Sequence, residues 1–138
     1  MIIADTGFWL ALASRTDKHH QAALRAMAGL REGLVTTWPV LTETCQLLLN
    51  RLGVTPQLAF LRGIRNGACS VFQVGEGHLT RIEELMEHYA DLPMDLADAS
   101  LVVLAEELGS GRIFSTDERE FHTYRWKSRR PFRNLLLS

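Results

Sequence analysis

Short apolar runs alternate with longer amphipathic segments along the whole chain, and this alternation restricts the folds that the chain can adopt. The apolar runs suit buried strands and occupy residues 1–4, 34–36, 69–74 and 112–115. Helical spacing marks the segments between them: 7–14, 18–31, 39–52, 55–65, 76–89 and 95–108. Residues 121–126 are predicted as a last, edge strand. Because strands that alternate with helices pair in parallel, the sequence predicts an α/β fold, a three-layer α/β/α sandwich with a central, mainly parallel sheet.

The chain shows no sign of a second domain or of a membrane segment. Its 138 residues fit one domain and contain no repeat, low-complexity stretch or linker, so residues 1–138 are predicted as a single domain. The apolar start lacks basic residues and carries Asp5, which argues against a signal peptide. Cys45 and Cys69 lie far apart and fit reduced thiols in a cytoplasmic protein.

One aspartate lies on the apolar face of the predicted helix 95–108. On a helical wheel of about 100° per residue, several apolar residues fall within roughly 60° of Asp98. They are Met94, Leu101, Val102 and Ala105. A carboxylate there is costly to desolvate and more often becomes neutral or meets a cation. The alternative is a buried acid that backbone donors satisfy.

Three further acids stand where open α/β sheets collect ligand groups. Asp5 and Asp117 directly follow predicted strands, and Glu43 lies beside the apolar stripe of the helix 39–52. Each also has a structural alternative. Asp5 can be a turn or cap residue, although Thr6 is expected to cap the first helix. Asp117 can form an Asx-type turn, and Glu43 can extend from the helix edge to solvent.

Taken together, Asp5, Glu43, Asp98 and Asp117 are expected to meet at one rim of the sheet. Several carboxylates at close range cannot all ionise without a cation. Oxygen donors without nearby His or Cys favour Mg²⁺ or Mn²⁺ over Zn²⁺. Such ions activate a water and neutralise a phosphodiester during in-line displacement. The predicted chemistry is therefore that of a metal-dependent nuclease.

Motifs for other chemistries are missing from the sequence. There is no G-x-x-x-x-G-K-[ST] loop, no G-x-G-x-x-G and no G-x-S-x-G. The paired motifs of the zinc deaminases are absent too. The five histidines are scattered in polar surroundings and are expected at the surface.

Charge is distributed unevenly although the net charge is only −1. All 16 acids lie before residue 121, and the remaining chain carries five Lys or Arg residues. A basic end on an acidic body suits a polyanion binder. Further phosphate contacts are expected from Arg51, Arg62, Arg65 and Arg119, each with solvated surface charge as the alternative.

Four short motifs around the acids resemble the PIN domain family, and within it the VapC-type toxins of bacterial toxin–antitoxin pairs. They are IIADTGFW at residues 2–9, PVLTE at 39–43, DLADASLV at 95–102 and STDEREF at 115–121. They occur in the family's order and extend the resemblance over essentially the whole chain. The resemblance implies a Mg²⁺-dependent ribonuclease, in which Mn²⁺ can substitute.

The resemblance also assigns roles to the acids. Asp5 and Asp98 would be the main metal ligands, Glu43 would bind directly or through water, and Asp117 would complete the site or orient a water. Thr6 and Thr116 match hydroxyl groups placed to hydrogen-bond the acids. Asp95 is either a supporting acid or a helix-start residue. Glu120 stands where many members have aspartate, and it is left outside the predicted site.

The family also implies partners, which the residues alone do not reveal. These are an RNA substrate, a protein antitoxin whose segment covers the active groove, and a second copy in a homodimer. Carboxylates and a metal explain cleavage of RNA and DNA equally, because no residue visibly reads the 2′-hydroxyl. Two alternatives therefore stay open: a metal-dependent DNA nuclease, and a non-catalytic RNA-binding or scaffold domain.

Overall fold

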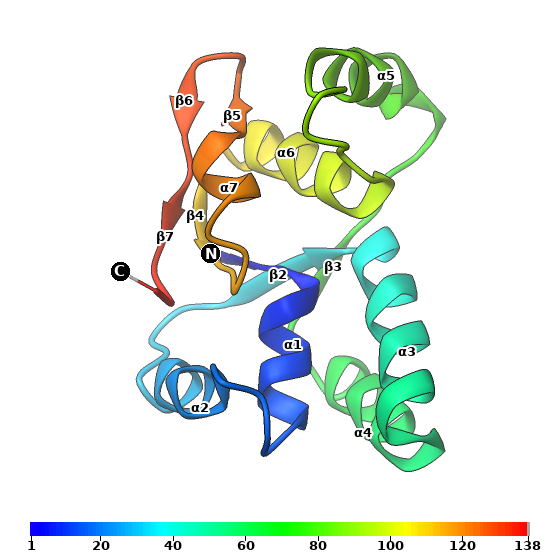
Figure 1. Ribbon diagram of the computed structural model, residues 1–138, viewed down its shortest axis with the longest axis vertical. Helices are drawn as coiled ribbons and strands as arrows, with labels where there is room; N and C mark the ends of the chain where they lie inside the picture. Colours follow the sequence, from blue (N-terminus) through cyan, green and yellow to red (C-terminus); the bar gives the residue numbers. More distant parts are fainter. Residues whose placement is uncertain (138) are drawn as a thin grey trace.

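A five-stranded parallel sheet forms the centre of the computed structural model, which describes residues 1–137 (Figure 1). Its strand order is β3-β2-β1-β4-β7, and all four neighbouring pairs are parallel. The strands are β1 (Ile2–Ala4), β2 (Leu34–Thr37), β3 (Ser70–Phe72), β4 (Arg112–Phe114) and β7 (Arg133–Asn134). A separate antiparallel pair is formed by β5 (Arg125–Trp126) and β6 (Arg130–Pro131).

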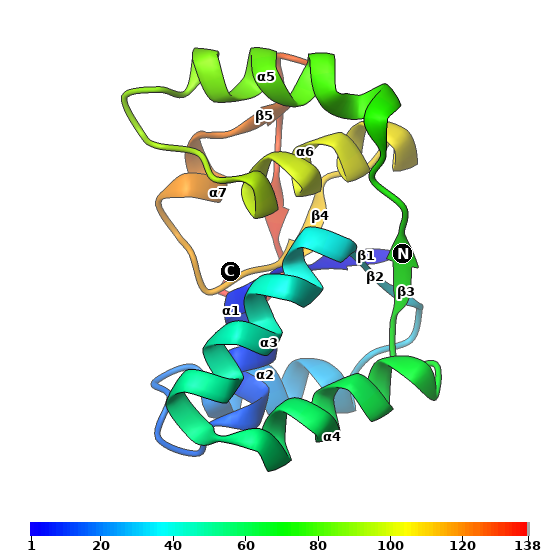
Figure 2. The same ribbon diagram turned by 90° about the vertical axis from the view of Figure 1, so that its right-hand side faces the viewer.

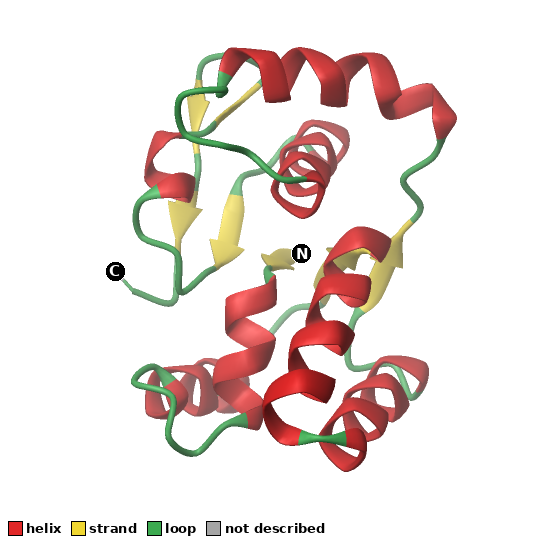
Figure 3. Ribbon diagram, turned by 45° about the vertical axis from the view of Figure 1, so that its right-hand side comes forward, coloured by secondary structure: helices red, strands yellow, loops and turns green. Residues whose placement is uncertain are grey.

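Helices cover both faces of the central sheet, which confirms the predicted three-layer sandwich. One side carries α1 (Thr6–Ala13), α2 (His20–Ala28), α3 (Trp38–Leu52) and α4 (Val54–Arg65) (Figure 2). The other side carries α5 (Leu79–His88), which follows the short 3-10 helix η1 (Glu76–His78), and α6 (Leu96–Leu108). Figure 3 shows the strands between these two helical layers. Within residues 1–137, no helix is both long and apolar enough to cross a membrane.

The core lies on both faces of the central strands, against α6 on one face and against α1 and α3 on the other. Ile3 and Ala4 of β1 are fully buried, as expected for a parallel sheet covered on both faces. On α6, Leu101 and Val102 are buried as the wheel predicts, and the helix packs on β2. The helix ends at Gly109, whose φ of +68° is a left-handed conformation that favours glycine. Near its start, α6 is fixed to the end of β2 by a hydrogen bond of 2.6 Å between the hydroxyl groups of Ser100 and Thr37.

Two helix starts differ from the prediction. The cap of α1 is Asp5 rather than Thr6, because the Asp5 carboxylate accepts a hydrogen bond from the Phe8 N–H at 3.1 Å. The second helix begins only at His20, because Asp17 instead accepts a hydrogen bond from the His19 N–H at 2.8 Å in the preceding turn. Short polar side chains compete in this way with helix formation.

The predicted edge strand at residues 121–126 is wrong. Its first part is the helical turn α7 (Glu120–Thr123), and only its end, β5, is extended, in the small antiparallel sheet. Phe121 and Tyr124, three positions apart, are both buried and pack edge to face at 5.2 Å. The fifth strand of the main sheet is β7, whose Arg133 N–H donates to the Gly111 carbonyl at 2.8 Å.

Candidate active site

A cavity of about 350 Å³ lies at the carboxyl-terminal ends of β1 and β4, and acids dominate its lining. All four predicted acids, Asp5, Glu43, Asp98 and Asp117, line this cavity. Asp95 and Glu120 line it as well, whereas no Lys, Arg or His does among the described residues. The structure therefore brings together acids that lie far apart in the sequence.

Asp5 is the most deeply buried of these acids, with 6% of its surface exposed. It caps α1 and also accepts a hydrogen bond from the Ser115 hydroxyl. Burial raises the pKa of Asp5 to about 6, although the hydrogen bonds from Ser115 and Phe8 lower it. Asn134 holds Ser115 in turn, because its amide donates to the Ser115 carbonyl at 2.9 Å. The carboxylate of Asp5 is therefore fixed from two sides.

Asp98 is held by a tyrosine that the sequence analysis did not single out. The Tyr124 hydroxyl donates to the Asp98 carboxylate at 2.9 Å, and Tyr124 is fully buried. Burial raises the pKa of Asp98 to about 7, the nearby charge of Asp95 raises it further, and the hydrogen bond from Tyr124 lowers it. Tyr124 was missed because its contact with Asp98 depends on the helical turn α7, where the pattern predicted a strand.

Glu43 of α3 and Asp95 at the start of α6 both line the cavity and lie close enough for their carboxyl groups to interact. Burial raises the pKa of Glu43, a hydrogen bond with Thr6 lowers it, and the charge of Asp95 raises it. Asp95 also caps α6, since its carboxylate accepts a hydrogen bond from the Asp98 N–H at 2.8 Å. The helix-start role considered for Asp95 is therefore real, and the same side chain lines the cavity.

Glu120, which was left outside the predicted site, lines the cavity beside Asp117. Asp117 accepts a hydrogen bond from the Glu120 N–H at 2.9 Å. Burial raises the pKa of Asp117, and the hydrogen bond between the two carboxyl groups raises it further, whereas it lowers the pKa of Glu120. The α7 turn brings residue 120 back toward 117, which an extended chain would not do.

The donor set suits a hard divalent cation. Six carboxylates surround one cavity without a basic side chain, and burial raises the pKa of several of them. Such a site favours a cation that prefers oxygen ligands, such as Mg²⁺ or Mn²⁺. Within residues 1–137, no three of these side chains converge closely enough to form a ready-made ligand cluster.

Gly7 allows the loop that carries Asp117 to approach α1. A Cβ atom on Gly7 would lie 1.9 Å from the Thr116 hydroxyl oxygen and 3.2 Å from the Thr116 Cβ, so the side chain of Thr116 would have to move. We expect Gly7→Ala to lower any cleavage activity by up to about 10²-fold, because small displacements of reacting groups have effects of this size. Thr116→Ala added to Gly7→Ala removes the clash and should restore part of the rate. Unchanged activity in Gly7→Ala would show that this close approach is dispensable.

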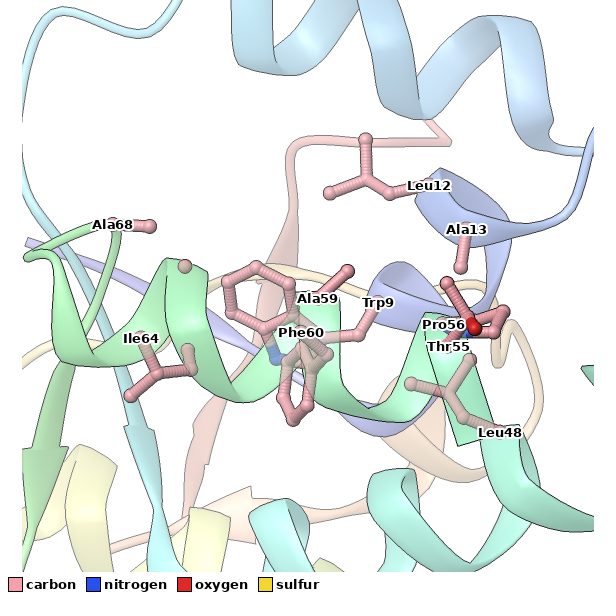
Figure 4. Close-up of a pocket in the computed structure, with 11 residues that line it drawn as sticks. Trp9, Leu12, Ala13, Leu48, Thr55, Pro56, Ala59, Phe60, Ile64 and Ala68 are labelled. Atoms are coloured by element: carbon pink, nitrogen blue, oxygen red, sulfur yellow. The ribbon is translucent and has the colours of Figure 1, made fainter. Parts of the chain in front are cut away.

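An apolar pocket of about 440 Å³ lies between α1, α3 and α4 and shares no lining residue with the acidic cavity (Figure 4). Trp9, Leu12 and Phe60 line it, and no acid or base does within the described part of the chain. The indole N–H of Trp9 is buried without a hydrogen-bond partner in residues 1–137. This lining offers contacts for an apolar group but no catalytic chemistry.

The arginines predicted as phosphate contacts do not line the acidic cavity. Arg51, Arg62 and Arg65 are exposed on the last turn of α3 and on α4. In the basic end of the chain, the Arg125 guanidinium donates to the carbonyls of His122, Thr123 and Tyr124 at 2.8 to 3.1 Å. Arg125 therefore stabilises the turn that holds Tyr124.

The part of the chain that carries the cavity acids is similar to known proteins. Residues 2–127, which contain all six acids, match the sequence model of the PIN domain. Ribonuclease VapC26 of Mycobacterium tuberculosis (strain ATCC 25618 / H37Rv) is 29% identical over 124 residues, which are 90% of this chain and 92% of that protein. The crystal structure of Mycobacterium tuberculosis VapC20, a Sarcin-Ricin loop cleaving toxin, is similar with a TM-score of 0.79 and 26% identity, over 86% of this chain and 92% of that chain.

Proposed function

The chain belongs to the PIN domain family and is of the VapC type, and on this premise we propose that residues 1–138 form one Mg²⁺-dependent endoribonuclease domain, the toxin of a type II toxin–antitoxin pair. The observation that supports the enzyme most directly is the cavity lined by six carboxylates and no base. VapC26 is named a ribonuclease, and VapC20 is described as a Sarcin-Ricin loop cleaving toxin.

In this proposal Asp5 and Asp98 are the main ligands of Mg²⁺ or Mn²⁺, and Glu43 and Asp117 complete the site. The bound ion would supply Lewis-acid stabilisation of the phosphodiester and acidify a water molecule. Ser115 orients Asp5, and Tyr124 orients Asp98, so that both carboxylates stay directed at the cavity. The Glu120 N–H donates to the Asp117 carboxylate and orients it in the same way.

The substrate is proposed to be RNA. Supporting this choice, VapC26 is named a ribonuclease and VapC20 is described as cleaving the Sarcin-Ricin loop. We expect the protein with Mg²⁺ to cleave single-stranded or hairpin RNA and to leave DNA of the same sequence intact. The measurement is side-by-side digestion of end-labelled RNA, DNA and a Sarcin-Ricin loop hairpin.

A preparation of Asp98→Asn made in parallel controls for contaminating ribonuclease in that digestion. Equal cleavage of RNA and DNA would favour the DNA nuclease. Binding of RNA without cleavage at any Mg²⁺ or Mn²⁺ concentration would favour the scaffold domain.

The proposal includes a protein antitoxin, a homodimer and a cytoplasmic location. The helices α3 and α4, which line the apolar pocket, also carry exposed apolar side chains. These are Leu49, Leu52, Val54, Leu58 and Leu61. An amphipathic helix of an antitoxin would bury such a surface.

A further inference from the structure

A second groove opens directly beside the acidic cavity. It has a volume of about 440 Å³ and shares Glu43, Asp95 and Ala97 with the lining of the cavity. Its other walls include Trp38, the first residue of α3, and Leu96, the first residue of α6. The groove therefore continues the acidic cavity along the surface, between the starts of these two helices.

Trp38 is an aromatic side chain presented to solvent on a rigid support. It is 57% exposed, whereas Trp9 and Trp126 are 5% and 6% exposed. Its backbone is fixed because Thr37 ends β2, caps α3 and hydrogen-bonds Ser100 of α6 at 2.6 Å. The ring of Trp38 is therefore a flat apolar surface that a binding partner can stack on, and its backbone is held in place.

Beyond Glu43 and Asp95, the residues that line the groove are uncharged. Thr42 and Gln46 provide a hydroxyl and an amide, and Pro39 and Leu96 add apolar surface. No Lys or Arg lines the groove in the described part of the chain. Such a lining suits a flat, uncharged heteroaromatic group with hydrogen-bonding edges, and it does not suit a phosphate.

We propose that this groove binds the nucleobase next to the scissile phosphate, which stacks on Trp38. The inference rests on the proposed nuclease function, because a phosphodiester held at the acids places an adjacent base within one nucleotide of them. The shared residues Glu43 and Asp95 make the two sites continuous. Gln46 then contacts the edge of the base. Trp38 is thus a substrate-positioning residue.

A second copy of this chain is the competing occupant. A two-fold contact through this groove would bring Glu43 and Asp95 of both copies toward one another. Removing these like charges from water without a compensating base is costly. Stacking of a nucleobase leaves the carboxylates at the solvated end of the groove, and for this reason the base is favoured.

The test compares Trp38→Ala, Trp38→Phe and the control Leu79→Ala, whose parent residue is also 57% exposed but lies at the start of α5. Steady-state cleavage is measured on an intact RNA and on the same RNA lacking the base beside the cleaved bond. We expect Trp38→Ala to raise KM by about 10-fold or more, with a smaller rise for Trp38→Phe and none for Leu79→Ala. Removing the base should raise KM similarly in the wild type and have little further effect in Trp38→Ala.

A second readout does not require cleavage. RNA added to Asp98→Asn should quench tryptophan fluorescence, and the quenching should disappear in Asp98→Asn/Trp38→Phe, since the other tryptophans are buried. If the wild type cleaves RNA but Trp38→Ala keeps its KM within two-fold, the base-binding groove is wrong while the nuclease stands. If sedimentation shows that Trp38→Ala converts a dimer into a monomer while its KM is unchanged, the groove binds a second copy of the chain. If no RNA is cleaved by the wild type, the proposed function itself fails.

Discussion

Asp98→Asn is expected to lower RNA cleavage by about 10³-fold or more while the metal-free protein becomes more stable. A ligand that stabilises charge in the transition state contributes several kcal/mol, and about 1.4 kcal/mol corresponds to ten-fold in rate. Asparagine keeps the shape of the side chain, and its amide oxygen can still accept the hydrogen bond from Tyr124. The variant therefore tests the charge of residue 98 rather than the fold.

The gain in stability follows from the pKa of Asp98. Folding raises this pKa from 3.8 to about 7, mainly through burial. The stability that the protonated group contributes is present below about pH 4 and is lost as the pH rises through about 7. Thermal unfolding in EDTA at pH 8 should thus show Asp98→Asn melting a few degrees higher, roughly 3–5 °C per kcal/mol, and the difference should vanish near pH 4.

Glu107→Gln provides the matched control for Asp98→Asn. Glu107 lies on the exposed side of the same helix, where its carboxylate is 3.5 Å from Nε2 of His78. This variant should cleave RNA at the wild-type rate and melt within about 1 °C of the wild type, as surface substitutions usually do. Full activity of Asp98→Asn would show that Asp98 is not part of the active site. If Asp98→Asn melts at a lower temperature than the wild type at pH 8, the Asp98 carboxylate is favourably bound without a cation.

Removing divalent cations should reduce cleavage to the level of Asp98→Asn. The six carboxylates repel one another when ionised, so without a cation the cavity binds protons and repels a phosphodiester. Adding Mg²⁺ or Mn²⁺ back should restore the rate. It should also stabilise the wild type against heat, by about 2.7 kcal/mol at a concentration of 100 times the Kd. Matched additions of NaCl control for charge screening.

Cleavage that persists after exhaustive chelation would contradict a metal-dependent mechanism. Equal stabilisation of the wild type and Asp98→Asn by Mn²⁺ would place the cation outside this cavity. Both outcomes are read from the same titration series, because rate and melting temperature are measured on the same samples.

The fold and the position of the four acids were predictable from the sequence because they depend on periodicity. Strand ends fix where Asp5 and Asp117 lie, and helical spacing fixes the faces that carry Glu43 and Asp98. An acid that has a structural role, such as capping a helix, can also line the cavity. Asp5, for example, both caps α1 and lines the cavity.

The supporting residues were not predictable because their positions depend on tertiary contacts. Tyr124 and Glu120 reach the cavity only through the α7 turn, which is too short to show a periodic pattern. Ser115 acts through its contact with Asp5, and Asn134 through the two-residue strand β7. Single residues in short elements carry little local signal, and packing decides their structure.

The most direct test of the acidic cavity as a cation site is calorimetric titration of Mn²⁺ into chelator-treated protein at about pH 7. We predict saturable binding to the wild type, accompanied by proton release, because the cation displaces protons from carboxyl groups whose pKa burial raises to about 6 and 7. Asp98→Asn should bind much more weakly and release fewer protons. No saturable binding to the wild type, or equal binding to both proteins, would contradict the account.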